Sequence, residues 1–363
     1  MNDRSSAPLP NTPAPKKRIR VLIVDDSSLV RGVLSEGLGA DPGIEVVGTA
    51  PDPFVARDKI VQLRPDVLTL DVEMPRMDGV DFLRRLMPQF PIPVIMVSAL
   101  TQKGKRITLE ALDAGAVDFV SKPTTDLARG LEGMMMELRT KVKIAANANV
   151  SHWKNKRHTL PSERTIEAPR ALAESTDKVI VIGASTGGTE AIRHIISRFP
   201  PTMPGVVIVQ HMPPGFTKMF AERLNTICAM EVKEAESGDR VLSGRILIAP
   251  GDIHTRIIRS GGIYQVRCEP GDKVCGHRPS VEVLMRSAAE HVGANAIGVM
   301  LTGMGADGAD AMGAMRQAGA RTMAQDEASC VVFGMPNEAY KRGGAERLVP
   351  LDKIANEIVR LLA

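Results

Sequence analysis

The amino-acid sequence predicts an α/β protein with two domains, each built around a mainly parallel sheet. Short, nearly all-apolar runs alternate with stretches of helical spacing in both halves of the 363-residue chain. Strands that are apolar on both sides are typical of parallel sheets covered by helices. A polar segment separates the two halves, and a chain of this length can bury two separate cores.

The first half contains five short apolar runs, which we interpret as the strands of a doubly wound parallel sheet. They occupy residues 18–24, 44–49, 67–70, 94–97 and 117–121. Stretches of helical spacing separate them, and a helix over about residues 126–146 closes this half. Residues 1–17 are polar and proline-rich without an apolar signal core, so they are expected to be a disordered tail. The first domain is therefore predicted over residues 18–146.

The second half follows a polar linker, residues 147–176, which has two prolines, many charges and little periodicity. The second domain is predicted over residues 177–363. Its expected strands occupy residues 178–182, 206–210, 245–249, 253–259, 263–268, 296–301 and 321–324. Its expected helices occupy residues 190–198, 217–225, 281–291, 309–318 and 354–362. The turn Ser260-Gly261-Gly262 predicts one antiparallel hairpin on the otherwise α/β sheet.

The composition argues against nucleic-acid and membrane partners. The net charge is +4, aromatic residues make up 3% of the chain, and no basic stripe alternates with aromatics. A surface that stacks bases needs such aromatics. No apolar run reaches the roughly 18 residues needed to span a bilayer, so no membrane insertion is expected. The four cysteines form no CxxC pair and are interpreted as reduced thiols of a cytoplasmic protein.

Polar side chains follow four of the predicted strands in the first half. Asp25 and Asp26 come directly after the first strand, Asp71 after the third, Ser98 after the fourth and Lys122 after the fifth. The carboxyl ends of parallel strands line one crevice. Three carboxylates there attract a hard dication such as Mg²⁺, while a lysine and a hydroxyl suit phosphoryl oxygens. Each aspartate alone could simply cap a helix, but the ordered set favours a site.

This half resembles the receiver domain of bacterial response regulators over roughly residues 19–140. The motifs DD, D-x-x-M-P-x-M-D-G, S-A and K-P carry the resemblance. It implies that Asp71 is the phosphoacceptor and that Ser98 and Lys122 sense the phosphoryl group. The family often has Thr at the Ser98 position, and Ser keeps the hydroxyl. The resemblance also implies a Mg²⁺ site formed by the carboxylates of Asp25, Asp26 and Asp71 and the carbonyl of Glu73.

The stretch VIVIGASTGGTEAIRHII, residues 179–196, combines a buried strand, a glycine turn and a helix start. Such a turn can cradle phosphate or hold a nucleophile. A P-loop needs lysine where Thr189 stands, so nucleotide binding loses its main charge partner. Residues 183–187 instead read G-x-S-x-G, and small neighbours can push the Ser185 hydroxyl outward. The following helix start can stabilise negative charge.

A nucleophile needs a base and an orienting acid, and two later strands supply both. The strand VVIVQHM delivers His211, and the turn after AIGVMLTGMG delivers Asp307. Alone, His211 could satisfy loop carbonyls and Asp307 could cap a helix, but three complementary residues at strand ends predict a triad. His194 is a competing base, although it lies within an apolar helical stretch rather than at a strand end.

The order Ser, His, Asp differs from the order Ser, Asp/Glu, His of α/β-hydrolases. From about residue 178 to 363 the chain instead resembles the catalytic domain of the chemotaxis protein-glutamate methylesterases, the CheB family. The segments GASTGGTEAI, QHMPPGFT, HRPSVEVL and LTGMGADG carry the resemblance. It implies cytoplasmic hydrolysis of glutamate methyl esters on chemoreceptor helices, and deamidation of selected receptor glutamines, with no cofactor needed for hydrolysis. It further implies a histidine kinase of the chemotaxis type as phosphodonor.

The resulting assignment makes Ser185 the nucleophile, His211 the general base and then acid, and Asp307 the group that orients the imidazole. Backbone amides near His211 and Met304 are candidate oxyanion donors. Three further residues could line the substrate cleft or form a structural turn: His277, Arg278 and Ser280. By family analogy, the unphosphorylated receiver covers the active-site face. A DNA-binding regulator, the competing class, should show a compact helix-turn-helix instead of a large glycine-rich α/β domain.

Overall fold

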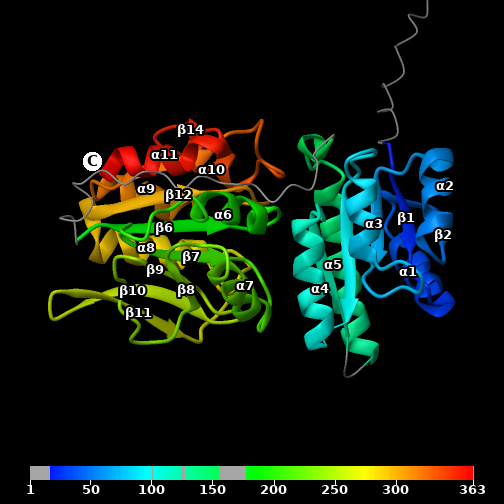
Figure 1. Ribbon diagram of the computed structural model, residues 1–363, viewed down its shortest axis with the longest axis horizontal. Helices are drawn as coiled ribbons and strands as arrows, with labels where there is room; N and C mark the ends of the chain where they lie inside the picture. Colours follow the sequence, from blue (N-terminus) through cyan, green and yellow to red (C-terminus); the bar gives the residue numbers. More distant parts are fainter. Residues whose placement is uncertain (1–16, 100, 124–126, 155–176, 363) are drawn as a thin grey trace, which may run out of the picture.

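The computed structural model describes residues 17–99, 101–123, 127–154 and 177–362, and it places two α/β domains side by side (Figure 1). Almost all of the predicted tail and most of the predicted linker lie outside these described residues. None of the helices in the described part of the chain is both long enough and apolar enough to cross a bilayer.

The first domain contains the predicted five-stranded sheet, in the order β2-β1-β3-β4-β5 with every neighbouring pair parallel. Its strands are β1 (Ile19–Val24), β2 (Ile44–Ala50), β3 (Val67–Asp71), β4 (Val94–Ala99) and β5 (Asp118–Lys122). Its helices are α1 (Ser28–Gly39), α2 (Pro53–Leu63), α3 (Gly79–Leu86), α4 (Gln102–Asp113) and α5 (Leu127–Ala145). The inner strands β1 and β3 are apolar because helices cover both faces of the sheet.

The second domain contains a sheet in the order β14-β13-β12-β6-β7-β9-β8, with parallel pairing throughout. Its strands are β6 (Val179–Ala184), β7 (Gly205–Gln210), β8 (Glu231–Glu234), β9 (Arg245–Ile248), β12 (Ala296–Met300), β13 (Arg321–Gln325) and β14 (Leu348–Val349). Its helices are α6 (Gly188–Ile196), α7 (Phe216–Asn225), α8 (Val281–His291), α9 (Ala309–Gln317), α10 (Met335–Lys341) and α11 (Leu351–Leu362). The strands β8 and β14 and the helix α10 are additions to the sequence prediction.

The predicted antiparallel hairpin is present as β10 (His254–Ser260) and β11 (Ile263–Glu269), and Gly261 and Gly262 at its tip both have positive φ. It forms a separate two-stranded sheet rather than an extension of the large one. The hairpin packs on α8 through β10. It therefore covers one side of the helix whose amino end borders the candidate site.

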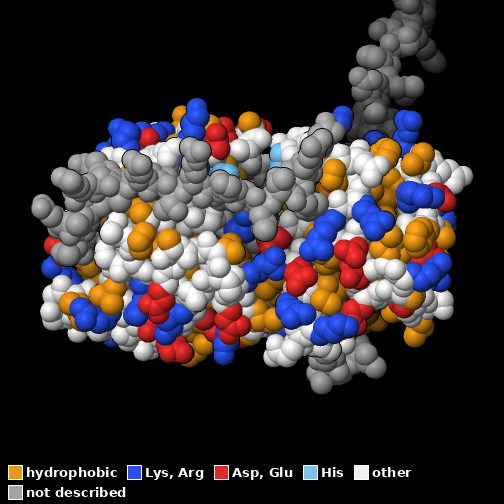
Figure 2. Space-filling view, in the orientation of Figure 1, with side chains coloured by type: hydrophobic (Ala, Val, Ile, Leu, Met, Phe, Trp, Pro, Cys, Tyr) orange, Lys and Arg blue, Asp and Glu red, His pale blue; other side chains and the backbone are white. Residues whose placement is uncertain are grey.

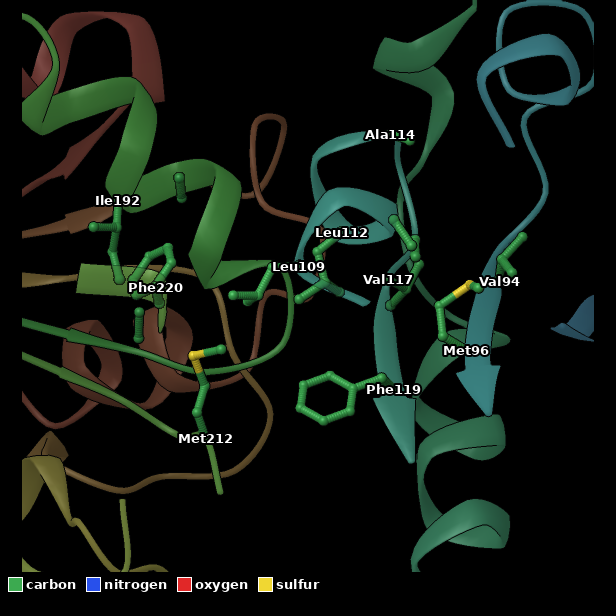
Figure 3. Close-up of a cluster of buried hydrophobic side chains, with 14 of the residues drawn as sticks. Val94, Met96, Leu109, Leu112, Ala114, Val117, Phe119, Ile192, Met212 and Phe220 are labelled. Atoms are coloured by element: carbon green, nitrogen blue, oxygen red, sulfur yellow. The ribbon is translucent and has the colours of Figure 1, made fainter. Parts of the chain in front are cut away.

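The two domains share an apolar interface. The helix α4 of the first domain packs on α6 and α7 of the second, and one cluster of buried hydrophobic side chains extends across both domains (Figure 3). The rings of Phe119 in β5 and Phe216 in α7 lie 4.4 Å apart between centroids. Asp113 and Arg223 form an ion pair across the same interface. The first domain is thus held against the face of the second that carries the loops after β6 and β7.

Candidate active site

The turn between β6 and α6 holds Ser185 at the carboxyl edge of the second sheet. The amide of Ser185 donates a hydrogen bond to the carbonyl of Thr302, which follows the neighbouring strand β12. The amide of Gly188 donates in turn to the carbonyl of Ser185. Gly187 has a φ of 77°, a left-handed conformation that glycine adopts without strain. The backbone of Ser185 is therefore fixed on both sides, which leaves its side chain to meet His211.

The residues Ser185, His211 and Asp307 form one hydrogen-bonded line. His211 follows β7, and its amide donates to the carbonyl of Ala184, which brings its imidazole beside Ser185. Its Nδ1 atom lies 3.1 Å from Ser185 Oγ, and its Nε2 atom lies 2.8 Å from a carboxylate oxygen of Asp307. The side chains of His211 and Asp307 are 8% and 1% exposed. The three residues predicted at strand ends are thus within hydrogen-bonding reach of one another.

Asp307 is held by the amino end of α8. The hydroxyl of Ser280 donates to its carboxylate at 2.7 Å, and the amides of Val281 and Glu282 donate at 2.7 and 3.0 Å. Burial works to raise the pKa of Asp307. The hydrogen bond and the charge interaction with His211, together with the hydrogen bonds from Ser280 and the Glu282 amide, outweigh burial and hold this pKa below its usual value. An ionised carboxylate can only accept, so the imidazole proton lies on Nε2 and the Nδ1 lone pair faces Ser185.

The other two polar residues of the HRPS segment, His277 and Arg278, have different roles. Arg278 pairs with Asp252 at 2.6 Å and supports the local turn. The imidazole of His277 instead stacks on that of His211, with ring centroids 3.8 Å apart and an angle of 11° between the planes. Arg278 and the buried Ser280 are therefore structural residues of the segment. His277 lines the site.

His194 is the histidine closest in sequence to Ser185 and the competing candidate for the base. It lies in the last turn of α6. The helix carries it roughly 9 Å along its axis beyond the first helical residue. His211 meets Ser185 directly, so the hydrogen-bond geometry favours His211 as the base.

The two candidate oxyanion donors differ in their surroundings. The amide of His211 already donates to the carbonyl of Ala184 at 3.1 Å, which leaves it poorly disposed toward a substrate oxygen. Met304 lies in the turn after β12, with its side chain half exposed. A Cβ atom at the adjacent Gly303 would lie 2.7 Å from the Cβ of Ser185, so this turn approaches Ser185 closely. The geometry favours Met304 over His211.

The first domain lies in front of Ser185. A narrow cavity there has residues of both domains in its lining, among them Leu112, Asp118, Phe119, Ser185, Thr186 and His211. Its volume of about 10 Å³ holds about one water molecule. The hydroxyl of Thr186, next to Ser185, donates to the carboxylate of Asp118 at 2.7 Å. The first domain therefore narrows the approach to Ser185, which is only partly exposed in this arrangement.

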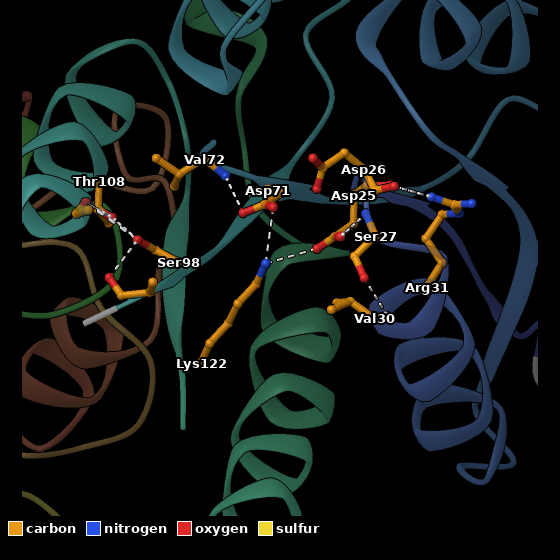
Figure 4. Close-up of polar contacts among 12 residues, drawn as sticks. Asp25, Asp26, Ser27, Val30, Arg31, Asp71, Val72, Ser98, Thr108 and Lys122 are labelled. Carbon is orange, nitrogen blue, oxygen red and sulfur yellow. Dashed lines mark hydrogen bonds and ion pairs between the residues drawn. The ribbon is translucent and has the colours of Figure 1, made fainter. Parts of the chain in front are cut away.

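The polar residues predicted at the strand ends of the first sheet also lie together (Figure 4). One ligand oxygen from each of Asp25, Asp26 and Asp71 lies within 4.8 Å of the others. The Nζ atom of Lys122 lies 3.0 Å from both Asp25 and Asp71. A cavity of about 600 Å³ opens beside them, and its lining includes Asp26, Asp71, Glu73, Ser98 and Lys122. The predicted residues thus line one open pocket, except for the buried Asp25, which contacts the lining residue Lys122.

The acidic pocket has the charge and the donor atoms that suit a hard dication. Burial raises the pKa of Asp71 to about 6, with Asp25 adding to the rise and Lys122 opposing it. Three carboxylates against one ammonium leave an excess of oxygen donors and negative charge, as Mg²⁺ sites require. The carboxylate of Glu73 pairs with Lys103 at 3.5 Å, so a ligand from Glu73 would be its backbone carbonyl.

Ser98 connects this pocket to α4. The hydroxyl of Thr108 in α4 donates to Ser98 Oγ at 2.7 Å, and both side chains are buried. The same helix carries Leu109 and Leu112, which belong to the apolar cluster at the interface with the second domain (Figure 3). No sequence motif marks Thr108. The hydroxyl of Ser98 also donates to the carbonyl of Gly104 in α4, so a displacement of Ser98 would reach the interface through these two bonds and one helix.

Comparison with known proteins accounts for both halves of the chain. Residues 180–358 match the family described as CheB methylesterase, and residues 21–130 match the response regulator receiver domain. A curated protein-glutamate methylesterase/protein-glutamine glutaminase of Syntrophotalea carbinolica is 71% identical over 96% of this chain and 98% of its own length. The enzyme of the same name from Salmonella typhimurium is 53% identical over 94% of this chain and 96% of its own length.

A solved structure supports the second domain in particular. The Thermotoga maritima CheB methylesterase catalytic domain is 40% identical and covers 51% of this chain and 98% of its own, with a TM-score of 0.50. The similarity to the full-length relatives extends over nearly the whole chain. The chain belongs to the CheB family, in which a response regulator receiver domain precedes a methylesterase domain.

Proposed function

We propose that the chain is a phosphorylation-controlled hydrolase that demethylates glutamate methyl esters on the cytoplasmic helices of chemoreceptors. It also deamidates selected receptor glutamines, because one nucleophile can attack both acyl groups. The hydrogen-bonded line Ser185–His211–Asp307 in a CheB-type domain carries this proposal. The test is release of methanol from methylated receptors, with and without a phosphodonor. A transcriptional or scaffolding regulator would release none in either condition.

Hydrolysis proceeds through an acyl-enzyme at Ser185. His211 Nδ1 takes the hydroxyl proton as Ser185 Oγ bonds to the ester carbonyl carbon. The imidazolium then protonates the leaving methoxide, and methanol departs; with a glutamine substrate, ammonia departs instead. Water next attacks the acyl group, its proton passing to His211, and glutamate is released as Ser185 regains its proton. Asp307 orients the imidazole and stabilises its positive charge throughout.

The amide of Met304 is the proposed donor to the oxyanion that forms on the attacked carbonyl. Its support is the close approach of the Gly303 backbone to Ser185. Donors fixed in place before the reaction stabilise developing charge without the cost of reorganisation. The amide of His211 is assigned a structural bond to Ala184 instead.

Asp71 is the proposed phosphoacceptor, and a histidine kinase of the chemotaxis type is the phosphodonor. The Mg²⁺ ion would be held by Asp25, Asp26, Asp71 and the Glu73 carbonyl, where it would offset charge on the transferring phosphoryl group. Lys122 and Ser98 would bind the phosphoryl oxygens. The cluster of three carboxylates around Lys122 supports these assignments.

The receiver controls access to Ser185 by covering it. The one-water cavity and the bond between Asp118 and Thr186 support this role. Phosphorylation would draw Ser98 toward Asp71 and away from Thr108, which weakens the anchor of α4 at the interface. Such a modification can shift the domains only by stabilising one arrangement more than the other.

Asp71→Asn should abolish stimulation by a phosphodonor and leave basal hydrolysis intact. Asn keeps the shape of the side chain but has no carboxylate to accept the phosphoryl group. Coupling between two sites is typically worth about 5- to 150-fold, so a phosphodonor should stimulate the wild-type protein by a factor in that range. It should not stimulate the Asp71 variant. Methanol release with and without acetyl phosphate measures it. Asp58→Asn, at an exposed carboxylate of the same domain, is the control that should stay stimulated, and persistent stimulation of the Asp71 variant would indicate another acceptor.

A fragment of residues 175–363 should be more active than the unphosphorylated whole protein. The triad and its supporting bonds come entirely from the second domain, so removing the receiver opens the cleft without removing a catalytic group. The expected gain is roughly 5- to 150-fold. Both forms are assayed on the same methylated receptor after circular dichroism confirms that the fragment is folded. A folded fragment less active than the whole protein would mean that the receiver contributes substrate contacts.

Arg223→Asp in the full chain gives an independent comparison. It replaces the ion pair with Asp113 by repulsion between two carboxylates and changes no residue of the triad. Basal methanol release should rise in the same direction as in the fragment. Unchanged release in both proteins would show that covering by the receiver does not limit the reaction.

A further inference from the structure

The imidazole of His277 covers one face of the imidazole of His211. The ring centroids are 3.8 Å apart and the planes are within 11° of parallel. The hydrogen bonds of His211 to Ser185 and Asp307 use atoms at the edge of its ring. His277 therefore contacts the one part of the imidazole that these two bonds do not restrain.

A tight turn presents His277 to this ring. The amide and carbonyl of His277 are both hydrogen-bonded to Val274, at 3.0 and 3.1 Å. Between them, Cys275 and Gly276 have φ angles of 52° and 81°, the left-handed pair that closes a two-residue hairpin turn. After His277 the chain is anchored through Ser280, whose hydroxyl binds Asp307. The stacked ring is thus fixed from both ends of its segment.

The stack is compatible with the charge that the reaction creates. Burial lowers the pKa of His277 to about 4, and the neighbouring His211 adds to this effect. His277 is therefore neutral near neutral pH. A neutral aromatic face can lie against an imidazolium without electrostatic repulsion and can stabilise it through its ring electrons.

We propose that His277 is a positioning residue that holds the plane of the His211 ring, so that Nδ1 stays directed at Ser185 Oγ. The inference rests on the proposed function of the triad. The histidine χ2 torsion, a rotation about the Cβ–Cγ bond, is intrinsically broad, and such a rotation would swing Nδ1 out of line with Ser185 Oγ. The ring of His277 blocks that rotation on one side. The proposal needs the aromatic face of His277 and neither its protons nor its lone pair.

The test compares His277→Ala with His277→Phe in the full-length protein, activated with acetyl phosphate and assayed on methylated receptor. His277→Ala should lower kcat roughly 10- to 100-fold with little change in KM, the scale expected for a misplaced catalytic group. His277→Phe restores a flat ring and should recover kcat to within roughly threefold of the wild type, since stacking needs only the ring face. His291→Ala, at an exposed histidine in the last turn of α8, is the matched control that should behave as wild type.

The alternatives give different results. A normal kcat in His277→Ala overturns the proposal, and so does a Phe variant as slow as the Ala variant. A rise in KM at constant kcat would make His277 a substrate contact instead. Circular dichroism and thermal unfolding of each variant separate misfolding from loss of positioning, because a misplaced imidazole lowers kcat in a protein that keeps the wild-type unfolding transition. Ser185→Ala separates failure of the His277 inference from failure of the proposed triad. If Ser185→Ala is inactive while His277→Ala is normal, only the His277 inference fails. If Ser185→Ala remains active, the triad assignment fails as well.

Discussion

Ser185→Ala should lower the rate of ester hydrolysis by about 10⁴- to 10⁶-fold, the cost of losing a triad nucleophile. The fold should survive, because the structural bonds of Ser185 come from its backbone. Its amide bonds the carbonyl of Thr302, and its carbonyl accepts from Gly188 and from Gln210. Alanine keeps all of these. Methanol release from methylated receptor, with acetyl phosphate present, measures the effect.

Ser260→Ala is a suitable control for this experiment, since Ser260 lies at the exposed tip of the β10–β11 hairpin. It should hydrolyse the ester at the wild-type rate. Near-normal methanol release from a folded Ser185 variant would rule out Ser185 as the nucleophile. An inactive protein that has also lost its thermal unfolding transition would instead point to a structural role for the side chain.

Asp307→Asn should lower kcat by about 10⁴-fold even though the side chain keeps its shape. An amide group facing His211 Nε2 donates a hydrogen bond, whereas the carboxylate accepts one. The imidazole proton would then move to Nδ1, the atom that faces Ser185, and the base would lose the lone pair that takes the hydroxyl proton. Single-turnover release of methanol measures this loss at the chemical step.

The same variant should also be less stable, by about 1–3 kcal/mol, because one acceptor is lost where several buried donors converge. Those donors are Ser280 Oγ and the amides at the start of α8. Urea unfolding followed by circular dichroism gives the free energy of unfolding. A folded Asp307→Asn protein with wild-type kcat would contradict the orienting role, whatever its stability.

The inner strands of both sheets were predictable because a strand that is buried on both faces has a continuous run of apolar residues in the sequence. β6 and β7 are apolar at almost every position and fully buried. The strand β8 escaped prediction because it lies at the sheet edge, with only Val232 buried among charged neighbours. The strand β14 has two residues, which is too short for any periodicity. Edge strands bury little side-chain surface, so their sequences carry little signal.

The candidate triad was predictable for a related reason. Ser185, His211 and Asp307 each follow a buried strand, and strands that pair in parallel bring their carboxyl ends together. The supporting residues were not predictable in this way. His277 reaches His211 through a turn more than sixty residues away in sequence, and Thr108 meets Ser98 through helix packing. No local pattern specifies such contacts.

The interface between the domains could not be predicted from the sequence, because its residues have the composition of an ordinary hydrophobic core. Leu109, Leu112 and Phe119 have the spacing and apolar character of ordinary core residues of the first domain. In the structure they belong to a cluster shared with the second domain (Figure 3). Elsewhere, the visible surface mixes both signs of charge with scattered apolar side chains (Figure 2). A buried interface within one chain looks in sequence like a slightly larger core.

Under the proposed function, the receiver and a receptor segment would compete for the surface in front of Ser185, where the cavity has room for about one water molecule. Two ligands that exclude each other are linked reciprocally: whatever weakens one favours the other by the same free energy. Under the proposed function, a receptor segment bound at Ser185 would hold the receiver in its released arrangement, the one that phosphorylation of Asp71 would also favour. Receptor density would then shift the equilibrium toward the released arrangement, and the substrate would help to set what fraction of its own enzyme is switched on.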